Sequence, residues 1–277
     1  MSIKHKLFSL IAGISALALV GCGSTETNSH EANGNSVQAE DSSLQRIQDS
    51  GKIVIGTTGN YRPYTYMDES NQLVGYDIEW GHLIAEGLGV EPEFVTGQFS
   101  GLLPGLTADR FDIILSGVNI TDERKESIDF SIPYSMDGAV AVIKKGTNAV
   151  ADITEIDDKV VGVNAGSAFD AAVREIGGYK ELREYPGAAE SFADLIAERL
   201  DVVAIGMVSA GEYMTNSSSG EHIEIVGEPF DIKNVGVALK KNSPELQEAI
   251  NEIIEENKEN GTYDQLTEEY FGITFDN

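Results

Sequence analysis

One stretch, "SGVNITDERKESIDFSIPY" from Ser116 to Tyr134, combines a turn of small residues with an arginine that could bind an anion. The guanidinium of Arg124 can make two parallel charge-assisted hydrogen bonds to a carboxylate, a geometry that lysine cannot match. The simpler interpretation is an exposed arginine on a helix that Thr121 caps, with Asp122 and Glu123 favourably placed in the first turn. The residues alone leave both interpretations open.

A second candidate segment begins a later helix. Ser167 and Asp170 fit the Ser/Thr-x-x-Asp/Glu capping box, which predicts that Ser167 caps the helix and that Asp170 reaches back to the amide of Ser167. Such a helix start also offers free N–H donors and a partial positive charge to an anion. We therefore expect Asp170 to be structural, although a buried carboxylic acid with a raised pKa could also act as a general acid.

Metal and nucleotide chemistry find little support in the sequence. The four histidines, His5, His30, His82 and His222, lack the spacing of metal ligands, and Cys22 is the only cysteine. We therefore predict no metal site and no cofactor. No G-x-x-x-x-G-K-S/T loop occurs, so the chain is not expected to hydrolyse ATP.

The composition is that of a strongly acidic globular protein. The chain has 277 residues, 41% of them hydrophobic, and a formal net charge of −27. This length suits two ordinary domains of ~100–200 residues each. A surface of such charge repels nucleic acid and anionic lipid headgroups, so we expect no nucleic-acid partner.

The N-terminus has the pattern of a lipoprotein signal peptide. Two lysines precede the apolar run Leu7 to Val20, which is shorter than the ~20 residues that span a bilayer. The tetrapeptide Leu19 to Cys22 has the form of a bacterial lipobox, and cleavage before Cys22 would leave a thiol for acylation, for example by palmitate. We expect residues 1–21 to be the signal peptide. Residues 22–43, which hold almost nothing apolar, should be a disordered tether to the outer face of the membrane.

Strands and helices alternate from Lys52 onwards. The apolar runs "KIVIGTT" and "FDIILSG" flank a helical pattern in "GYDIEWGHLIAEGLG", and the alternation restarts at "AVAVIKKG" and continues to "DVVAIG". This order predicts two α/β units, each with a parallel sheet flanked by helices. Ligands collect at the carboxyl ends of such strands, so two facing units would enclose a cleft.

Five segments carry a resemblance to a known family: "GTTGNYRPYTY", "LVGYDIEWGHLIAEGLG", "FSGLLPGLTADRFDIILSGVNITDERKESIDFSIPY", "KVVGVNAGS" and "ENGTYDQL". In this order and spacing they resemble the polar amino acid family of extracellular solute-binding proteins, which deliver substrate to ABC importers. The resemblance implies a two-lobed, periplasmic-binding-protein-like α/β fold of type II. Lobe 1 would be residues 44–139 plus 233–277 and lobe 2 residues 140–232, with two hinge crossings.

The resemblance also implies a set of binding residues: two aromatic side chains that sandwich the ligand, and polar or backbone groups that hold its α-carboxylate. The implied residues are Tyr61 and Phe99 for the sandwich, and Ser116, Gly117, Asn119, Arg124, Ser167 and Ala168 for the carboxylate. Tyr61 and Phe99 could also be ordinary core aromatics.

Two positions depart from the family's pattern. Most members place an aspartate at the position of Gly206, where it holds the ligand's α-ammonium, and many have a carboxylate at the position of Thr58. An unpaired ammonium is costly to desolvate in a closed cleft. We therefore expect either a ligand without that group or a substitute acid such as Asp170.

A secondary resemblance is to the cyclohexadienyl dehydratases, enzymes of the same fold that act on prephenate or arogenate. "GTTGNYRPYTY" and "FSIPYSMDG" carry it, and it would make Asp170 the general acid. Phe169 replaces a polar residue of the enzymes, and Asp170 is one methylene shorter than their glutamate. The enzyme is therefore an alternative to the main hypothesis.

The main hypothesis is a monomeric, lipid-anchored, extracytoplasmic protein that is not an enzyme. It would close two lobes on a small carboxylate-containing solute, expected to be an amino acid or a derivative, and present it to an ABC permease. A sensory module that uses the same cleft is a further alternative.

Overall fold

The computed structural model describes residues 42–272, which lie in one compact unit, residues 40–277. The predicted signal peptide, Cys22 and nearly all of the predicted tether lie outside the described residues. Helix α1 (Ser43–Ser50), which the sequence analysis did not predict, begins at the end of the tether range and buries Ile47. Gly51 ends it in the left-handed conformation, at φ 69°, which glycine adopts without strain.

The first sheet has the strand order β5-β1-β6-β13-β7. Its strands are β1 (Lys52–Thr57), β5 (Glu91–Thr96), β6 (Ile113–Ile114), β7 (Ile128–Phe130) and β13 (Ala238–Lys240). β1 is parallel to β5 and β6, while β13 is antiparallel to both β6 and β7. Only β13 therefore runs antiparallel to the other strands. This late segment of the chain completes a sheet whose other strands come from residues 52–130.

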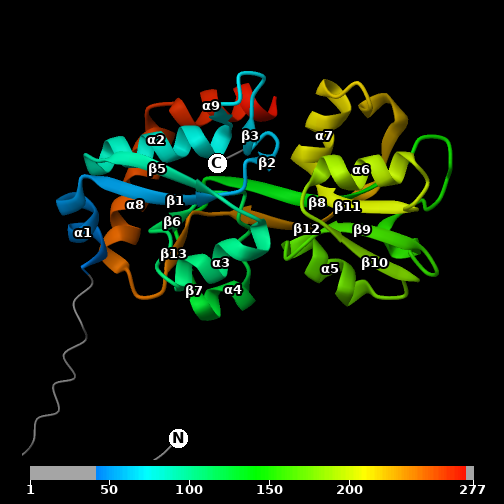
Figure 1. Cartoon of the computed structure of the whole chain (residues 1–277), viewed down its shortest axis with the longest axis horizontal. Helices are drawn as coiled ribbons and strands as arrows, with labels where there is room; N and C mark the ends of the chain where they lie inside the picture. The colour runs from blue at the N-terminus through cyan, green and yellow to red at the C-terminus, as the bar shows by residue number, and fades with distance from the viewer. Residues whose placement is uncertain (1–41, 273–277) are drawn as a thin grey trace, which may run out of the picture. The chain divides into compact units, whose positions relative to one another are not determined.

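Helices cover both faces of this sheet (Figure 1). They are α2 (Tyr76–Leu88), α3 (Phe99–Thr107), α4 (Asp122–Ser127), α8 (Pro244–Glu259) and α9 (Thr262–Phe271). Residues of α2, α8 and α9 pack in one buried cluster against one face, and residues of α3 pack with β6, β7 and β13 on the other. The apolar faces of α2, α3, α8 and α9 thus pack against the sheet, while α4 buries no residue.

The second sheet has the order β10-β9-β11-β8-β12. Its strands are β8 (Ser135–Lys144), β9 (Val160–Asn164), β10 (Glu181–Tyr185), β11 (Val202–Gly206) and β12 (Ile223–Val235). β9, β10 and β11 are parallel, and β8 pairs antiparallel with both β11 and β12. Only β8 runs against its neighbours, so both sheets are mainly parallel, as predicted.

The helices around the second sheet bury two separate apolar clusters on its faces. They are α5 (Ala168–Ile176), α6 (Ala188–Ile196) and α7 (Met207–Asn216), with short 3₁₀ turns η1 (Ile153–Glu155) and η2 (Gly220–His222). The predicted α/β fold is confirmed. The long strand β12 was not predicted, because its sequence "IEIVGEPFDIKNV" alternates poorly and bulges between Val226 and Lys233.

The chain passes between the two sheets at two places: from β7 to β8, and from β12 to β13. β8 and β12 pair over almost their whole length, from Ser135 opposite Val235 to Lys144 opposite Ile223. These paired strands join the sheets, and a third, small sheet of β2 (Asn60–Tyr61), β3 (Thr65–Met67) and β4 (Leu73–Val74) lies beside the first. The lobe boundaries at 139/140 and 232/233 stay predictions.

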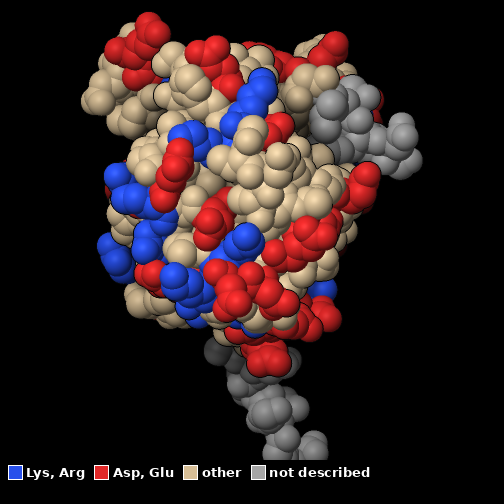
Figure 2. All heavy atoms as spheres, turned by 90° about the vertical axis from the view of Figure 1, so that its right-hand side faces the viewer, with Lys and Arg blue, Asp and Glu red and all other residues tan. Residues whose placement is uncertain are grey.

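On the surface around the second sheet, acidic and basic side chains are interspersed (Figure 2). Several form ion pairs, such as Arg174 with Glu184 and Lys144 with Glu198, both at 2.5 Å. Between residues 42 and 272, no helix is both long enough and apolar enough to cross a bilayer.

Candidate functional site

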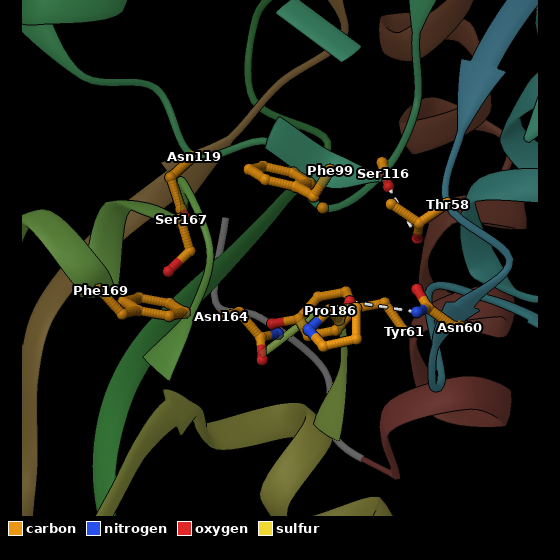
Figure 3. A pocket seen from close by; sticks show the side chains of 11 residues that line it. Thr58, Asn60, Tyr61, Phe99, Ser116, Asn119, Asn164, Ser167, Phe169 and Pro186 are labelled. Carbon is orange, nitrogen blue, oxygen red and sulfur yellow. Dashed lines mark hydrogen bonds between the residues drawn. The ribbon is translucent and has the colours of Figure 1, made fainter. Parts of the chain in front are cut away.

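A pocket lies between segments that follow the strands of the first sheet and segments that follow those of the second, at the carboxyl ends of β1, β6 and β9 (Figure 3). We call it the central pocket. It is lined by Thr58, Asn60, Tyr61, Phe99, Ser116, Gly117, Asn119, Asn164, Ser167, Phe169 and Pro186. Its volume is about 30 Å³, far below the ~300–1,000 Å³ of pockets that hold a drug-sized ligand. Its walls must therefore part before a larger solute can enter.

A second, wider groove of about 510 Å³ adjoins the central pocket. We call it the outer groove. It is lined by Leu103, Thr121, Glu123, Arg124, Ser127, Gly166, Ser167, Ala168, Asp170, Ala171, Ala172, Arg174, Glu175, Asp231 and Lys233. Ser167 lines both spaces, so the two meet at the start of α5.

The structure brings together most of the residues that the resemblance implied. Tyr61, Phe99, Ser116, Gly117, Asn119 and Ser167 line the central pocket, together with Thr58. Arg124 and Ala168 line the outer groove instead.

The turn after β6, which forms one wall of the central pocket, is held by a buried carboxylate that the sequence analysis missed. Gly117 has φ 59°, and its amide donates a 2.7 Å hydrogen bond to Oδ2 of Asp77, whose Oδ1 accepts one from the Tyr134 hydroxyl at 2.7 Å. Burial raises the pKa of Asp77 to about 7. A Cβ at position 117 would lie 3.1 Å from the ring of Tyr61, so glycine permits both the turn and the close approach of that ring.

Two aromatic side chains form separate walls of the central pocket (Figure 3). Tyr61 lies at the end of β2 and stacks on Tyr64, with ring centroids 5.4 Å apart and an interplanar angle of 6°. Phe99 begins α3, and its ring lies 5.6 Å from the guanidinium carbon of Arg124. Tyr64 is fully buried behind Tyr61.

Arg124 lies on the short helix α4, capped by Thr121 as predicted. Its guanidinium donates to the carbonyl oxygens of Asn119, at 2.8 Å, and Gly166, at 3.2 Å. Partial burial lowers the pKa of Arg124 to about 10. Within residues 42–272 no carboxylate forms an ion pair with it, so this cation sits at the junction of pocket and groove with only neutral acceptors. Such a site favours an anion.

Two polar atoms in the wall of the central pocket have no hydrogen-bond partner within the described part of the chain. They are Nδ2 of Asn119, a donor, and Oδ1 of Asn164, an acceptor. Buried polar atoms are normally paired, and leaving one unpaired costs about 1–3 kcal/mol. Both are therefore well placed to bind a polar ligand. Asn164 was not predicted as a site residue, although it ends a buried strand inside "KVVGVNAGS".

The start of α5 agrees with the predicted capping box only in part. Ser167 Oγ accepts a hydrogen bond from the amide of Asp170 at 3.0 Å, as predicted. The prediction for the Asp170 side chain was wrong: Oδ2 accepts from the amide of Gly166 at 3.3 Å, and Oδ1 accepts from Nε of Arg174 at 2.7 Å. The guanidinium one turn later draws the carboxylate away from the amide of Ser167. Asp170 faces the outer groove and is paired, which suits neither a general acid nor a partner for an ammonium.

The space beside Gly206 holds a different carboxylate. Gly206 ends β11, and a Cβ there would overlap both the carboxylate of Asp137 and the hydroxyl of Tyr61. Asp137 lies on β8, the antiparallel neighbour of β11, and is only 3% exposed. Burial raises the pKa of Asp137 to about 7. The sequence analysis missed Asp137; an aspartate within the apolar strand "SMDGAVAVIK" was the available signal.

Hydrogen bonds join the two sides across the central pocket. Asn60 Nδ2 donates to the carbonyl of Pro186 at 3.1 Å, and Ser209 Oγ donates to the carbonyl of Arg62 at 2.6 Å. Arg62 also lies 3.5 Å from a carboxylate oxygen of Glu212 on α7. Together with the bond from Arg124 to Gly166, these contacts hold the two sides closed.

Known proteins resemble this chain along most of its length. Residues 53–273 match the family of bacterial extracellular solute-binding proteins, family 3. The L-cystine-binding protein TcyJ of Escherichia coli (strain K12) is 28% identical over 273 residues, which cover 98% of this chain and 98% of the relative. The L-arginine-binding protein of Pseudomonas aeruginosa is 32% identical over 228 residues, which cover 80% of this chain and 88% of the relative.

A solved structure bears on the dehydratase alternative. The crystal structure of the ancestral amino acid-binding protein AncCDT-1, a precursor of cyclohexadienyl dehydratase, matches with a TM-score of 0.77 at 31% identity. The match covers 82% of this chain and 99% of that one. These findings confirm the resemblance seen in the sequence motifs, and the relatives are binding proteins, not enzymes.

Proposed function

Since the chain belongs to the bacterial extracellular solute-binding proteins of family 3, we propose that it binds an amino acid or an amino acid derivative in the central pocket and delivers it to an ABC importer. The single observation that carries the proposal is Arg124. Its guanidinium lies beside the pocket, has lost part of its hydration, and among the described residues is bonded only to neutral carbonyl oxygens. A carboxylate would supply the missing counter-charge.

Further groups are placed to bind the ligand's carboxylate. The unpaired Nδ2 of Asn119 can donate to a carboxylate oxygen. The start of α5, with Ser167 and Ala168, adds the positive end of a helix from the opposite side. In the proposed complex, Tyr61 and Phe99 enclose the ligand's side chain.

We also propose that lobe closure is the mechanism of capture. The ligand would first dock on lobe 1 through Arg124 and Asn119, and lobe 2 would then close over it. The hydrogen bonds from Asn60 to Pro186 and from Ser209 to Arg62 would form on closure. The division into lobe 1 (residues 44–139 plus 233–277) and lobe 2 (residues 140–232) is part of this proposal, as is a monomeric state.

The binding proposal is tested by a thermal-shift screen of the purified protein against the common L-amino acids, L-cystine and simple organic acids. A ligand at 100 times its Kd adds about 2.7 kcal/mol to the free energy of unfolding. For a protein of this size, that should raise Tm by about 5–10 °C. If no amino acid or derivative raises Tm at millimolar concentration, the proposal is wrong.

The anchoring proposal concerns Cys22, which lies outside the described residues. We propose that signal peptidase cleavage before Cys22 and acylation of its thiol tether the protein to the outer face of the membrane. In a bacterial host, the wild-type protein should sediment with membranes and incorporate labelled palmitate. Cys22→Ala should appear in the soluble fraction without label. A Cys22→Ala variant that still carries the label would contradict the proposal.

A further inference from the structure

The central pocket has a means of recognising a carboxylate but no evident partner for an ammonium. None of its lining side chains carries a charge. The unpaired Oδ1 of Asn164 can accept one hydrogen bond but cannot neutralise a cation. If the ligand is an amino acid, as proposed above, its α-ammonium needs a negative charge in or just behind the wall.

Three buried aspartates lie near the pocket, and contacts within the described residues distinguish them. Both oxygens of Asp77 are used, by the amide of Gly117 and the hydroxyl of Tyr134. Asp170 is paired with Arg174 and faces the outer groove. Asp137, like Asp77, forms no ion pair within residues 42–272, but it has an oxygen near the hydroxyl of a side chain that lines the pocket, Tyr61.

Asp137 also lies in a suitable place. Its Oδ1 accepts from the amides of Gly138, at 2.9 Å, and Val208, at 3.3 Å, which fixes the carboxylate in the sheet. The other oxygen lies over Gly206, on the side where the hydroxyl of Tyr61 also lies. Tyr61 in turn lines the central pocket. Tyr61 thus connects the pocket to a buried acid.

We propose that Asp137 is the residue that makes the pocket select a ligand with an α-ammonium, and that it acts through Tyr61. The Tyr61 hydroxyl donates its proton to Asp137 and accepts a hydrogen bond from the ammonium. Gly206 is required because any side chain there would occupy the place of the carboxylate. Asp137 is therefore a positioning residue, and Tyr61 is the group that contacts the ligand.

The charge balance supports this arrangement. An ionised carboxylate buried without a cation is unfavourable, and a ligand ammonium one hydroxyl away would compensate it. Arg124 and Asp137 approach the pocket from different elements, α4 and β8. A zwitterion, with one charge near each, would match both. An acid without the amine would match only Arg124, so the protein should prefer amino acids over their deaminated analogues.

The test measures that preference by calorimetry with two matched pairs: L-cystine against dithiodipropionate, and L-arginine against δ-guanidinovalerate. The preference is the Kd of the deaminated acid divided by the Kd of the amino acid. For Asp137→Asn we expect the preference to fall at least about tenfold, the value of one charge-assisted hydrogen bond. The matched control is Asp201→Asn, because Asp201 precedes the opposite end of β11 and accepts from the amide of Val160. It should leave the preference as in the wild type.

Two further variants separate recognition from mere support of the fold. Tyr61→Phe removes only the hydroxyl and should lower the preference about as much as Asp137→Asn, with no further loss in the double variant. The double variant Asp137→Ala with Gly206→Asp moves the carboxylate to the neighbouring strand and, with a small shift of the Tyr61 hydroxyl away from the new Cβ, should restore the preference. These readouts remain informative if Asp137→Asn folds poorly, since Tyr61→Phe keeps the carboxylate.

Each outcome decides between the proposals. If the wild type binds both members of a pair equally, or if Asp137→Asn and Tyr61→Phe keep the full preference, the role of Asp137 is refuted while carboxylate binding stands. Equal weakening of both members of a pair would show a structural role only. If the wild type binds neither pair, the comparison is made with the amino acid that gives the largest thermal shift and its deaminated analogue; if no amino acid binds, the proposed function fails, and this inference fails with it.

Discussion

Replacing Arg124 by methionine should separate binding from stability. Methionine keeps much of the length of the side chain but removes the charge and the hydrogen-bond donors. In the folded protein, burial lowers the pKa of Arg124 from 12.5 to about 10. This lowering corresponds to at most about 3 kcal/mol of unfavourable free energy, because the side chain is only partly buried and solvent screens part of its charge.

The loss of two hydrogen bonds opposes the stability that is gained by removing the partly buried charge. Arg124→Met loses the hydrogen bonds to the carbonyls of Asn119 and Gly166. Bonds from a charged donor contribute about 1.5–3 kcal/mol each, less where solvent can replace them. The free energy of unfolding should therefore change by no more than about 2 kcal/mol in either direction. Affinity should fall far more, since a bound carboxylate left without its cation loses about 2–4 kcal/mol, or about 30- to 1000-fold.

The assay combines urea denaturation without ligand and calorimetric titration with the amino acid that gives the largest thermal shift. Lys125→Met is the matched control, because Lys125 lies on the same helix, has a side chain that is 54% exposed and, within residues 42–272, pairs only with Asp122 at 3.4 Å. It should change neither quantity appreciably. A variant Arg124→Met that unfolds much more easily but keeps its affinity would refute the reasoning and make Arg124 a structural residue.

Three further predictions concern the walls and the closure of the pocket. Gly117→Ala should destabilise the fold by about 1–2 kcal/mol and weaken binding, because φ is 59° and the new Cβ meets the Tyr61 ring at 3.1 Å; unchanged urea midpoints would contradict this. The pKa of Asp77 is about 7 in the folded chain against an ordinary 3.8, so the folded state binds the extra proton between these values. The free energy of unfolding should fall, by up to about 4 kcal/mol for the full difference, as pH rises from about 4 to 7. Asp137, whose pKa is also about 7, contributes to the same slope, so Asp77→Asn should reduce it by about half in urea titrations at pH 5 and 8; an unaltered slope would exclude Asp77 as a source. Ser209→Ala removes the bond to the Arg62 carbonyl and should weaken binding about fivefold, with a larger radius of gyration by small-angle scattering; equal affinity and radius would show that this bond does not stabilise closure.

The sequence was sufficient to predict the elements that lie at the carboxyl ends of the strands. The motifs around Tyr61, Phe99 and Ser116 are local. Each follows a strand of the first sheet, at the end where ligands collect. The sequence also predicted the cap of α5 by Ser167. It failed for the side chain of Asp170, because the competing partner Arg174 could be recognised only once the helix was built.

The residues that were missed depend on pairings between distant parts of the chain. Asp137 reaches Gly206 only because β8 pairs antiparallel with β11. Asp77, in the first turn of α2, reaches Gly117 only because α2 packs on the sheet that contains β6. No spacing along the sequence encodes such proximity. The strand β12 was missed for a related reason: its two register shifts interrupt the alternation by which a strand is recognised.

The position of Asp137 links the choice of ligand to the mechanics of the molecule. Asp137 lies opposite Lys233 in the paired strands β8 and β12, next to a register shift between Phe230 and Lys233. These are the strands that carry the chain from one sheet to the other, and a bulge is where a strand pair bends most readily. The acid that is proposed to select for the ammonium thus lies on the paired strands that join the two sheets. A deaminated acid would then bind lobe 1 without favouring closure, because it lacks the positive charge that stabilises the closed geometry of these strands.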